Sequence, residues 1–183
     1  MLKKNPLCMK TRYWAIAFTC VVLAFACEDK ESHVIVGKDK DFLFKAGAAS
    51  QADLIYGQLA AVKGDNPQVR AFGLQMANAH QRAIEDLRNI ALSDNIQLTT
   101  GMDKIHEKRL SILLTLVGAP FDTAYVSAQL KNHQEAIALY QSELDSGKVD
   151  ALRAHASSYL MFMQSQKTNA ENLTLALTAR SND

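Results

Sequence analysis

Apolar side chains recur at helical spacing along most of this 183-residue chain, and no stretch alternates apolar and polar residues for long enough to indicate a β-strand. Steps of three and four residues place such side chains on one face of a helix. Turn-forming residues interrupt the pattern at Gly64, at Asn66 and Pro67, and at Gly147. Five helices are therefore predicted, over residues 41–63, 67–92, 102–117, 120–146 and 149–179.

Four of these helices are long and one is short. A folded part of about 145 residues is enough for a single core of ordinary size. Three prolines and eight glycines are too few for a β fold with many turns. We expect an all-α fold, an antiparallel four-helix bundle with one additional short helix, in a domain over residues 39–179.

The first 26 residues have the composition of an export signal. The first twelve of them include four basic residues and no acidic one, and an apolar run follows over residues 13–26. A helix of these 14 residues would span roughly 21 Å, which is short of the roughly 30 Å hydrocarbon core of a bilayer. A cleaved signal is therefore expected in preference to a membrane anchor.

Cys27 directly follows this run, after the small residues Ala24 and Ala26. This order is similar to the site at which bacterial lipoproteins are cleaved and lipidated, so we expect lipid on Cys27, with plain secretion as the alternative. Residues 27–38 would form a polar tether to the membrane. Because Glu28, and not Asp, follows the cysteine, we expect the outer membrane, with the domain either periplasmic or exposed at the surface.

Charge and cysteine usage exclude several functions. Cleavage before Cys27 would remove four of the 20 basic residues and none of the 19 acidic ones, leaving a net charge of −3. Nucleic-acid binding is not expected, since no basic cluster remains. With Cys27 as the last cysteine, the mature chain has no internal disulfide, thiolate metal site or cysteine nucleophile.

Polar residues interrupt the apolar stripe of each long helix near its midpoint. They are Asp53, His80, His133 and Gln166, with Gln164 as an alternative to the last. The midpoints of antiparallel helices share one level of a bundle, so these side chains should meet as a polar layer inside the core.

Three interpretations of this layer remain open. The favoured one is a structural hydrogen-bond network that fixes the register of the helices. The second is a site for a divalent transition metal such as zinc, iron or copper, bound by the two imidazoles and the carboxylate. The third is a proton-transfer or redox site. A di-iron centre is disfavoured, because Ala77 and Leu130 stand where Glu-x-x-His pairs need glutamate. A non-catalytic protein is favoured over an enzyme.

Several segments also resemble a known family, the ferritin-like domain of unknown function DUF 4142, whose members are bacterial outer membrane or periplasmic proteins. The resemblance covers about residues 39–177 and implies a ferritin-like helical bundle without an established activity. The residues that carry it are Asp41-Phe42-Leu43 through Asp53, Asn66-Pro67-Gln68-Val69 leading to His80, Leu116-Val117-Gly118-Ala119-Pro120-Phe121-Asp122-Thr123-Ala124-Tyr125-Val126, and His133-Gln134-Glu135-Ala136.

The chain departs from the family pattern in two places. Asp53 stands where relatives commonly have glutamate, which is one methylene longer. Leu160, Met161 and Gln166 stand where relatives have a Leu-Pro pair and a histidine, so a third histidine is missing. Glutamine is a poor ligand for transition metals, which weakens the metal hypothesis. The sequence thus predicts a non-catalytic envelope lipoprotein anchored to the membrane by lipid, with a metal-binding bundle as the alternative, and it identifies no protein partner.

Overall fold

The computed structural model describes residues 34–98 and 101–180, and all its regular structure is helical within these ranges. The all-α prediction is confirmed. The helices are α1 (Gly37–Lys63), α2 (Pro67–Ser93), α3 (Lys104–Thr115), α4 (Gly118–Ser146) and α5 (Asp150–Arg180).

Short polar side chains determine where two of the helices begin. The side chain of Asn66 accepts a hydrogen bond of 2.8 Å from the backbone N–H of Gln68, and Pro67 occupies the first position of α2. The carboxylate of Asp103 accepts hydrogen bonds from the backbone N–H groups of Ile105 and His106 at the start of α3.

The break before α4 lies earlier than predicted. Leu116 and Val117 have extended backbone conformations, and α4 begins at Gly118, whereas the sequence predicted a start at residue 120. Pro120 therefore lies inside the first turn of the helix. Proline is tolerated there because the first backbone N–H groups of a helix have no intrahelical acceptor to lose.

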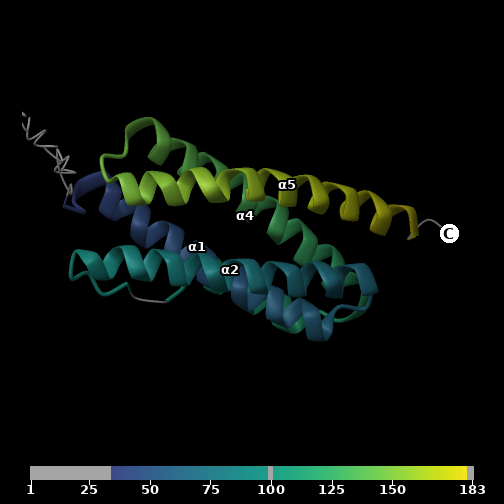
Figure 1. Cartoon of the computed structure of the whole chain (residues 1–183). Helices are drawn as coiled ribbons and strands as arrows, with labels where there is room; N and C mark the ends of the chain where they lie inside the picture. Colours follow the sequence, from purple (N-terminus) through teal and green to yellow (C-terminus); the bar gives the residue numbers. More distant parts are fainter. Residues whose placement is uncertain (1–33, 99–100, 181–183) are drawn as a thin grey trace, which may run out of the picture. The chain divides into compact units, whose positions relative to one another are not determined.

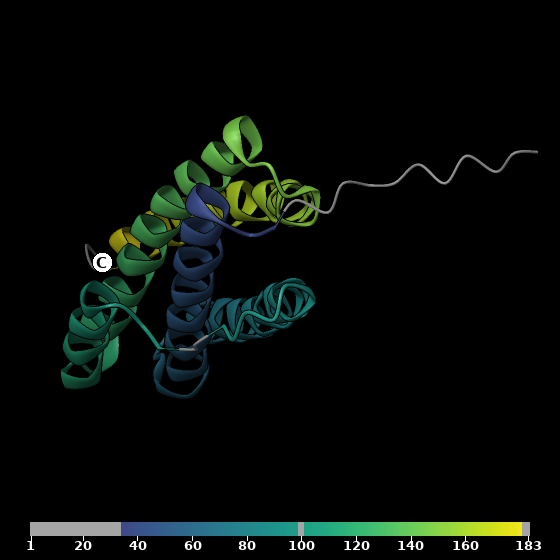
Figure 2. The same ribbon diagram turned by 90° about the vertical axis from the view of Figure 1, so that its left-hand side faces the viewer.

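The four long helices form a bundle of two helical pairs. Helix α1 packs against α2, and α4 packs against α5; α1 also contacts α4, and α2 contacts α5 (Figure 1). Seen after a quarter turn, α2 is viewed nearly end-on, while α1 and α4 run across the view (Figure 2). The short helix α3 contacts α1 and α4. None of the helices in the described ranges is long and apolar enough to cross a membrane.

The apolar core consists of two main clusters, one toward each end of the bundle. The first takes residues from the beginning of α1 and the end of α2, and the second takes residues from the end of α1 and the beginning of α2. Helices α4 and α5 contribute to both in the same way. The first cluster includes Phe42, Leu43, Leu87, Tyr140 and Leu152, and the second includes Tyr56, Phe72, Met76, Phe121 and Tyr125.

Candidate functional site

A group of buried polar side chains lies between the two apolar clusters. In the sequence of their helices, His80, His133 and Gln166 fall between the residues of one cluster and those of the other, and Asp53 directly follows Ala52, the first residue of α1 in the second cluster. Each of the four side chains is at least 96% buried. The polar interruptions noted in the sequence thus occupy the middle of the core.

The structure brings three of these four residues together. The Nε2 atom of His80 lies 3.6 Å from the Oδ2 atom of Asp53. The rings of His80 and His133 meet edge to face, with 6.1 Å between their centroids. The ring of Phe162 in α5 lies 6.3 Å from that of His80, between their centroids.

Gln166 is buried, but its side chain is hydrogen-bonded within its own helix. Its Oε1 atom accepts a hydrogen bond of 3.0 Å from the side chain of Asn169. Within residues 34–98 and 101–180, no hydrogen bond joins Gln166 to Asp53 or to either histidine.

The ring of His133 has a defined orientation. Its Nδ1 atom lies 2.7 Å from the backbone carbonyl oxygen of Gln129, one turn earlier in α4. A carbonyl oxygen only accepts hydrogen bonds, so Nδ1 carries the proton and, in the neutral ring, Nε2 carries the lone pair. That Nε2 atom is buried and has no hydrogen-bond partner among the described residues.

His80 is held in its neutral form. Burial lowers the pKa of His80 from its usual 6.5 to about 4, although the charge of Asp53 acts in the opposite direction. Neither of its ring nitrogens has a hydrogen-bond partner in the described part of the chain. A buried polar atom without a partner lowers the free energy of unfolding by about 1 to 3 kcal/mol. The His80 ring therefore destabilises the core if its role is purely structural.

Further polar residues of α4 belong to the site and were missed in the sequence. Asn132, Gln129 and Tyr125 are all buried, and the amide of Gln129 and the hydroxyl of Tyr125 have no hydrogen-bond partner in the described ranges. Tyr125, Gln129 and His133 follow one another at steps of four residues, which would have indicated a shared face. Burial, and secondarily the charge of Asp53, raise the pKa of Tyr125, so its hydroxyl stays protonated.

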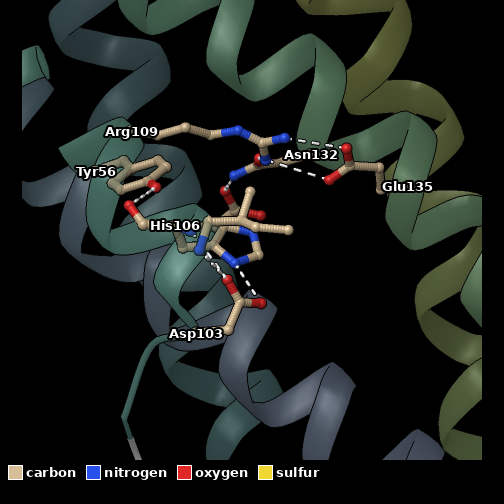
Figure 3. A network of polar contacts seen from close by, with 8 residues as sticks. Tyr56, Asp103, His106, Arg109, Asn132 and Glu135 are labelled. Atoms are coloured by element: carbon tan, nitrogen blue, oxygen red, sulfur yellow. Dashed lines mark hydrogen bonds and ion pairs between the residues drawn. The ribbon is translucent and has the colours of Figure 1, made fainter.

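A chain of polar contacts runs from Asp53 to the surface, and Figure 3 shows its part from Asn132 through Arg109 of α3 to Glu135. The side-chain N–H of Asn132 donates a hydrogen bond of 2.6 Å to Asp53. The guanidinium of Arg109 donates to the side-chain oxygen of Asn132 and pairs with Glu135 at 3.0 and 3.2 Å. Asp53 is therefore oriented by a network that begins at the half-exposed carboxylate of Glu135.

Several polar atoms of this group have no hydrogen-bond partner among the described residues. The unpartnered atoms include the two histidine Nε2 atoms and the amide of Gln129. Even so, in the residues that the structure describes, no three His, Cys, Asp or Glu side chains are grouped so that they could hold a metal ion. Cys27, the predicted lipid attachment site, lies outside the described residues.

Comparison with known families defines the class of the protein. The match to the family described as a domain of unknown function (DUF4142) covers residues 26–173. The chain belongs to this family, as the resemblance in its sequence predicted. No curated protein and no solved structure matches the chain.

Proposed function

We propose that the protein is a non-catalytic lipoprotein of the bacterial cell envelope, whose helical domain is held at the outer membrane by lipid on Cys27. The observation that carries the proposal is the position of Cys27 at the end of a short apolar run that begins with basic residues. Helix α1 begins at Gly37, so about ten residues are left to serve as a tether.

The chemistry of the buried site supports a non-catalytic role. General base catalysis is most efficient when the pKa of the base lies near the working pH. His80, with a pKa of about 4, is a weak proton acceptor at neutral pH.

The test of lipidation compares two cysteine variants of the full chain expressed in a bacterium. Cys27→Ser removes the proposed attachment site, while Cys20→Ser alters a cysteine inside the signal and serves as the matched control. We expect lipid-modified protein in the outer membrane fraction for the parent and for Cys20→Ser only. An unmodified cysteine in the intact mass of the mature parent would show that the protein is simply secreted.

A second candidate function is metal binding, and one observation favours it. Histidines that bind metals usually donate the other ring N–H to a carbonyl or carboxylate, as His133 does toward Gln129. Ligand atoms at about 2.0 to 2.1 Å from a tetrahedral ion lie roughly 3.4 Å apart, a geometry that follows from common zinc coordination distances. The Asp53–His80 separation of 3.6 Å is close to that value.

Binding would require His133 to move toward this pair, because the three side chains do not form a metal site as they stand. The Asn132 contact would keep Asp53 in place while the His133 ring moves. With two imidazoles and one carboxylate, the site would suit zinc, copper or iron and leave a coordination position open.

The test is elemental analysis of the chain from residue 28 onward, purified without chelator and then titrated with zinc, copper and iron. We expect one equivalent of metal in the parent and none in a His80→Ala/His133→Ala variant. His155→Ala is the control, since His155 is a buried histidine outside the site. A folded parent that stays empty in every titration would eliminate this candidate.

A further inference from the structure

The short helix α3 lies over the seam between α1 and α4, next to the buried polar site. Figure 3 shows the contacts on both sides: Tyr56 of α1 reaches the backbone of α3 at His106, and Arg109 of α3 reaches Asn132 and Glu135 of α4. The hydroxyl of Tyr56 donates a hydrogen bond of 2.6 Å to the carbonyl oxygen of His106. At the end of α3, the ammonium of Lys63 donates to the carbonyl oxygens of Leu113 and Leu114.

Apolar burial attaches α3 mainly through Leu113, which is 2% exposed in the second apolar cluster, and through Leu110, which packs against that cluster. Of its 12 residues, all of which the structure describes, His106 and Leu113 are buried. Ile105, Ile112 and Leu114 are each at least half exposed. The first half of α3 buries no aliphatic side chain and gains little from the hydrophobic effect, so its docking depends on a few polar contacts. Segments of this kind open more readily than the core of a protein.

Arg109 is the contact that ties α3 to the buried site. Its guanidinium binds the amide oxygen of Asn132, and the amide nitrogen of Asn132 in turn binds Asp53. The Arg109 side chain is 16% exposed and the Glu135 side chain is 50% exposed. Detaching α3 would therefore open a path from the surface at Glu135 to the carboxylate of Asp53.

We propose that α3 is a cover that detaches from α1 and α4 to let small cations reach the buried histidines. The contacts of Arg109 keep this cover attached. The nature of the solute, a divalent transition-metal ion, rests on the metal-binding candidate above, whereas the opening of α3 does not. Glu135 at the rim and Asp53 inside the path would attract a cation, and the positive charge of Arg109 blocks the path while α3 is docked.

The opening is tested by the reaction of histidines with diethyl pyrocarbonate in the purified mature protein, followed by mass spectrometry of each histidine-containing peptide. We compare the parent with Arg109→Gln and with the matched control Arg153→Gln, which removes an ion pair to Asp150 on α5. His155, which is buried but does not contact α3, serves as the internal standard.

In Arg109→Gln we expect His80 and His133 to react about tenfold faster or more, because hydrogen bonds to a charged group are lost. His155 should keep the rate it has in the parent, and Arg153→Gln should behave as the parent at His80 and His133. Unchanged rates at His80 and His133 would overturn the proposal. An equal acceleration at His155 would also overturn it, because it would indicate general unfolding.

A milder variant covers the case in which Arg109→Gln does not fold. Glu135→Gln weakens the ion pair but leaves the Arg109–Asn132 contact in place, so we expect a severalfold acceleration at the same two histidines. The rate of zinc uptake by the same variants separates the two proposals. Faster uptake supports both the opening of α3 and the metal site. Faster histidine modification without any zinc binding supports the opening of α3 and eliminates the metal site.

Discussion

Burial of Glu143 in α4 and the nearby carboxylate of Asp39 in α1 together raise the pKa of the Glu143 carboxyl group, which favours a proton on this pair. Glu143 is 3% exposed. Asp39 also accepts hydrogen bonds of 2.7 and 2.9 Å from the backbone N–H groups of Lys148 and Val149. The pair thus joins the beginning of α1 to the turn between α4 and α5.

The stability of this junction should depend on pH. Burial, together with the charge of Asp39, raises the pKa of Glu143 from 4.5 to about 7, while Arg153 acts in the opposite direction. A pKa raised by folding means that the folded state binds the proton more tightly. The contribution is complete below about pH 4.5 and is lost as the pH rises to about 7. We expect a loss of about 1 to 2 kcal/mol of unfolding free energy across this window.

Glu143→Gln isolates the effect, since a neutral amide donates a hydrogen bond to Asp39 without titrating. Unfolding free energies from urea titrations between pH 4.5 and 8 should differ between parent and variant by an amount that changes with pH. Parallel curves would show that Glu143 titrates as an ordinary exposed glutamate does.

Two buried histidines should have the opposite effect. Burial lowers the pKa of His80 and of His155 from 6.5 to about 4. Their contribution is complete above pH 6.5 and is lost as the pH falls to about 4, because unfolding lets the rings take up protons. In the same titrations, acidification should lower the unfolding free energy of His155→Gln by about 1 to 2 kcal/mol less than that of the parent. A variant that loses as much as the parent would mean that His155 is already charged in the folded state.

The periodicity of the sequence was sufficient to predict the helices, because the apolar residues and the interruptions between them act locally. Asn66 and Asp103 stabilise helix starts through neighbours two and three residues away, and such signals can be read without the fold. The meeting of Asp53, His80 and His133 inside the core followed from the same spacing, since antiparallel helices of similar length align their midpoints.

The remaining polar residues could not be found in this way. Gln129, Asn132 and Glu143 are all buried, but no pattern in the sequence singled them out. The residues that interact with them lie far along the chain: Asn132 contacts Asp53 across 79 positions, and Asp39, which raises the pKa of Glu143, lies 104 positions before it. Long-range pairs of this kind leave no local pattern.

Two fully buried tyrosines offer a test of unpaired polar groups. The Tyr56 hydroxyl donates a hydrogen bond to His106, whereas the Tyr125 hydroxyl has no partner in the described ranges. Tyr56→Phe should lower the unfolding free energy by about 1 kcal/mol. Tyr125→Phe should leave it unchanged or raise it by up to about 1 kcal/mol, because an unsatisfied buried hydroxyl is removed. Equal losses in the two variants would reveal a hydrogen bond at Tyr125.

Asp122 gives a structural reason for part of the sequence motif at the start of α4. Its carboxylate is buried and accepts hydrogen bonds of 3.0 and 2.7 Å from the backbone N–H groups of Asp65 and Asn66. Asp122→Ala would leave both N–H groups at the α1–α2 turn without this acceptor, so we expect a loss of about 2 to 3 kcal/mol in thermal or urea unfolding. The exposed neighbour Thr123 provides the control, and Thr123→Ala should change stability by less than about 0.5 kcal/mol.

The approach of α1 to α2 depends on two glycines that face each other. A Cβ atom added to Gly57 would lie 2.6 Å from the carbonyl oxygen of Gly73 and 2.7 Å from the backbone nitrogen of Ala77. Neither contact can be relieved by turning a side chain, because both atoms belong to the backbone. Gly57→Ala should therefore push the helices apart and cost about 2 to 3 kcal/mol, which exceeds the gain of about 1 kcal/mol in helix propensity.

Gly101→Ala is the matched control for this substitution. A Cβ atom at Gly101 would meet nothing within 4 Å, so the added methyl group only restricts the unfolded chain and should stabilise the protein slightly or leave it unchanged. Urea unfolding of the two variants beside the parent measures the difference. If Gly57→Ala were as stable as Gly101→Ala, the two helices could separate without loss, and the layer of Asp53 and His80 between them would not depend on their close contact.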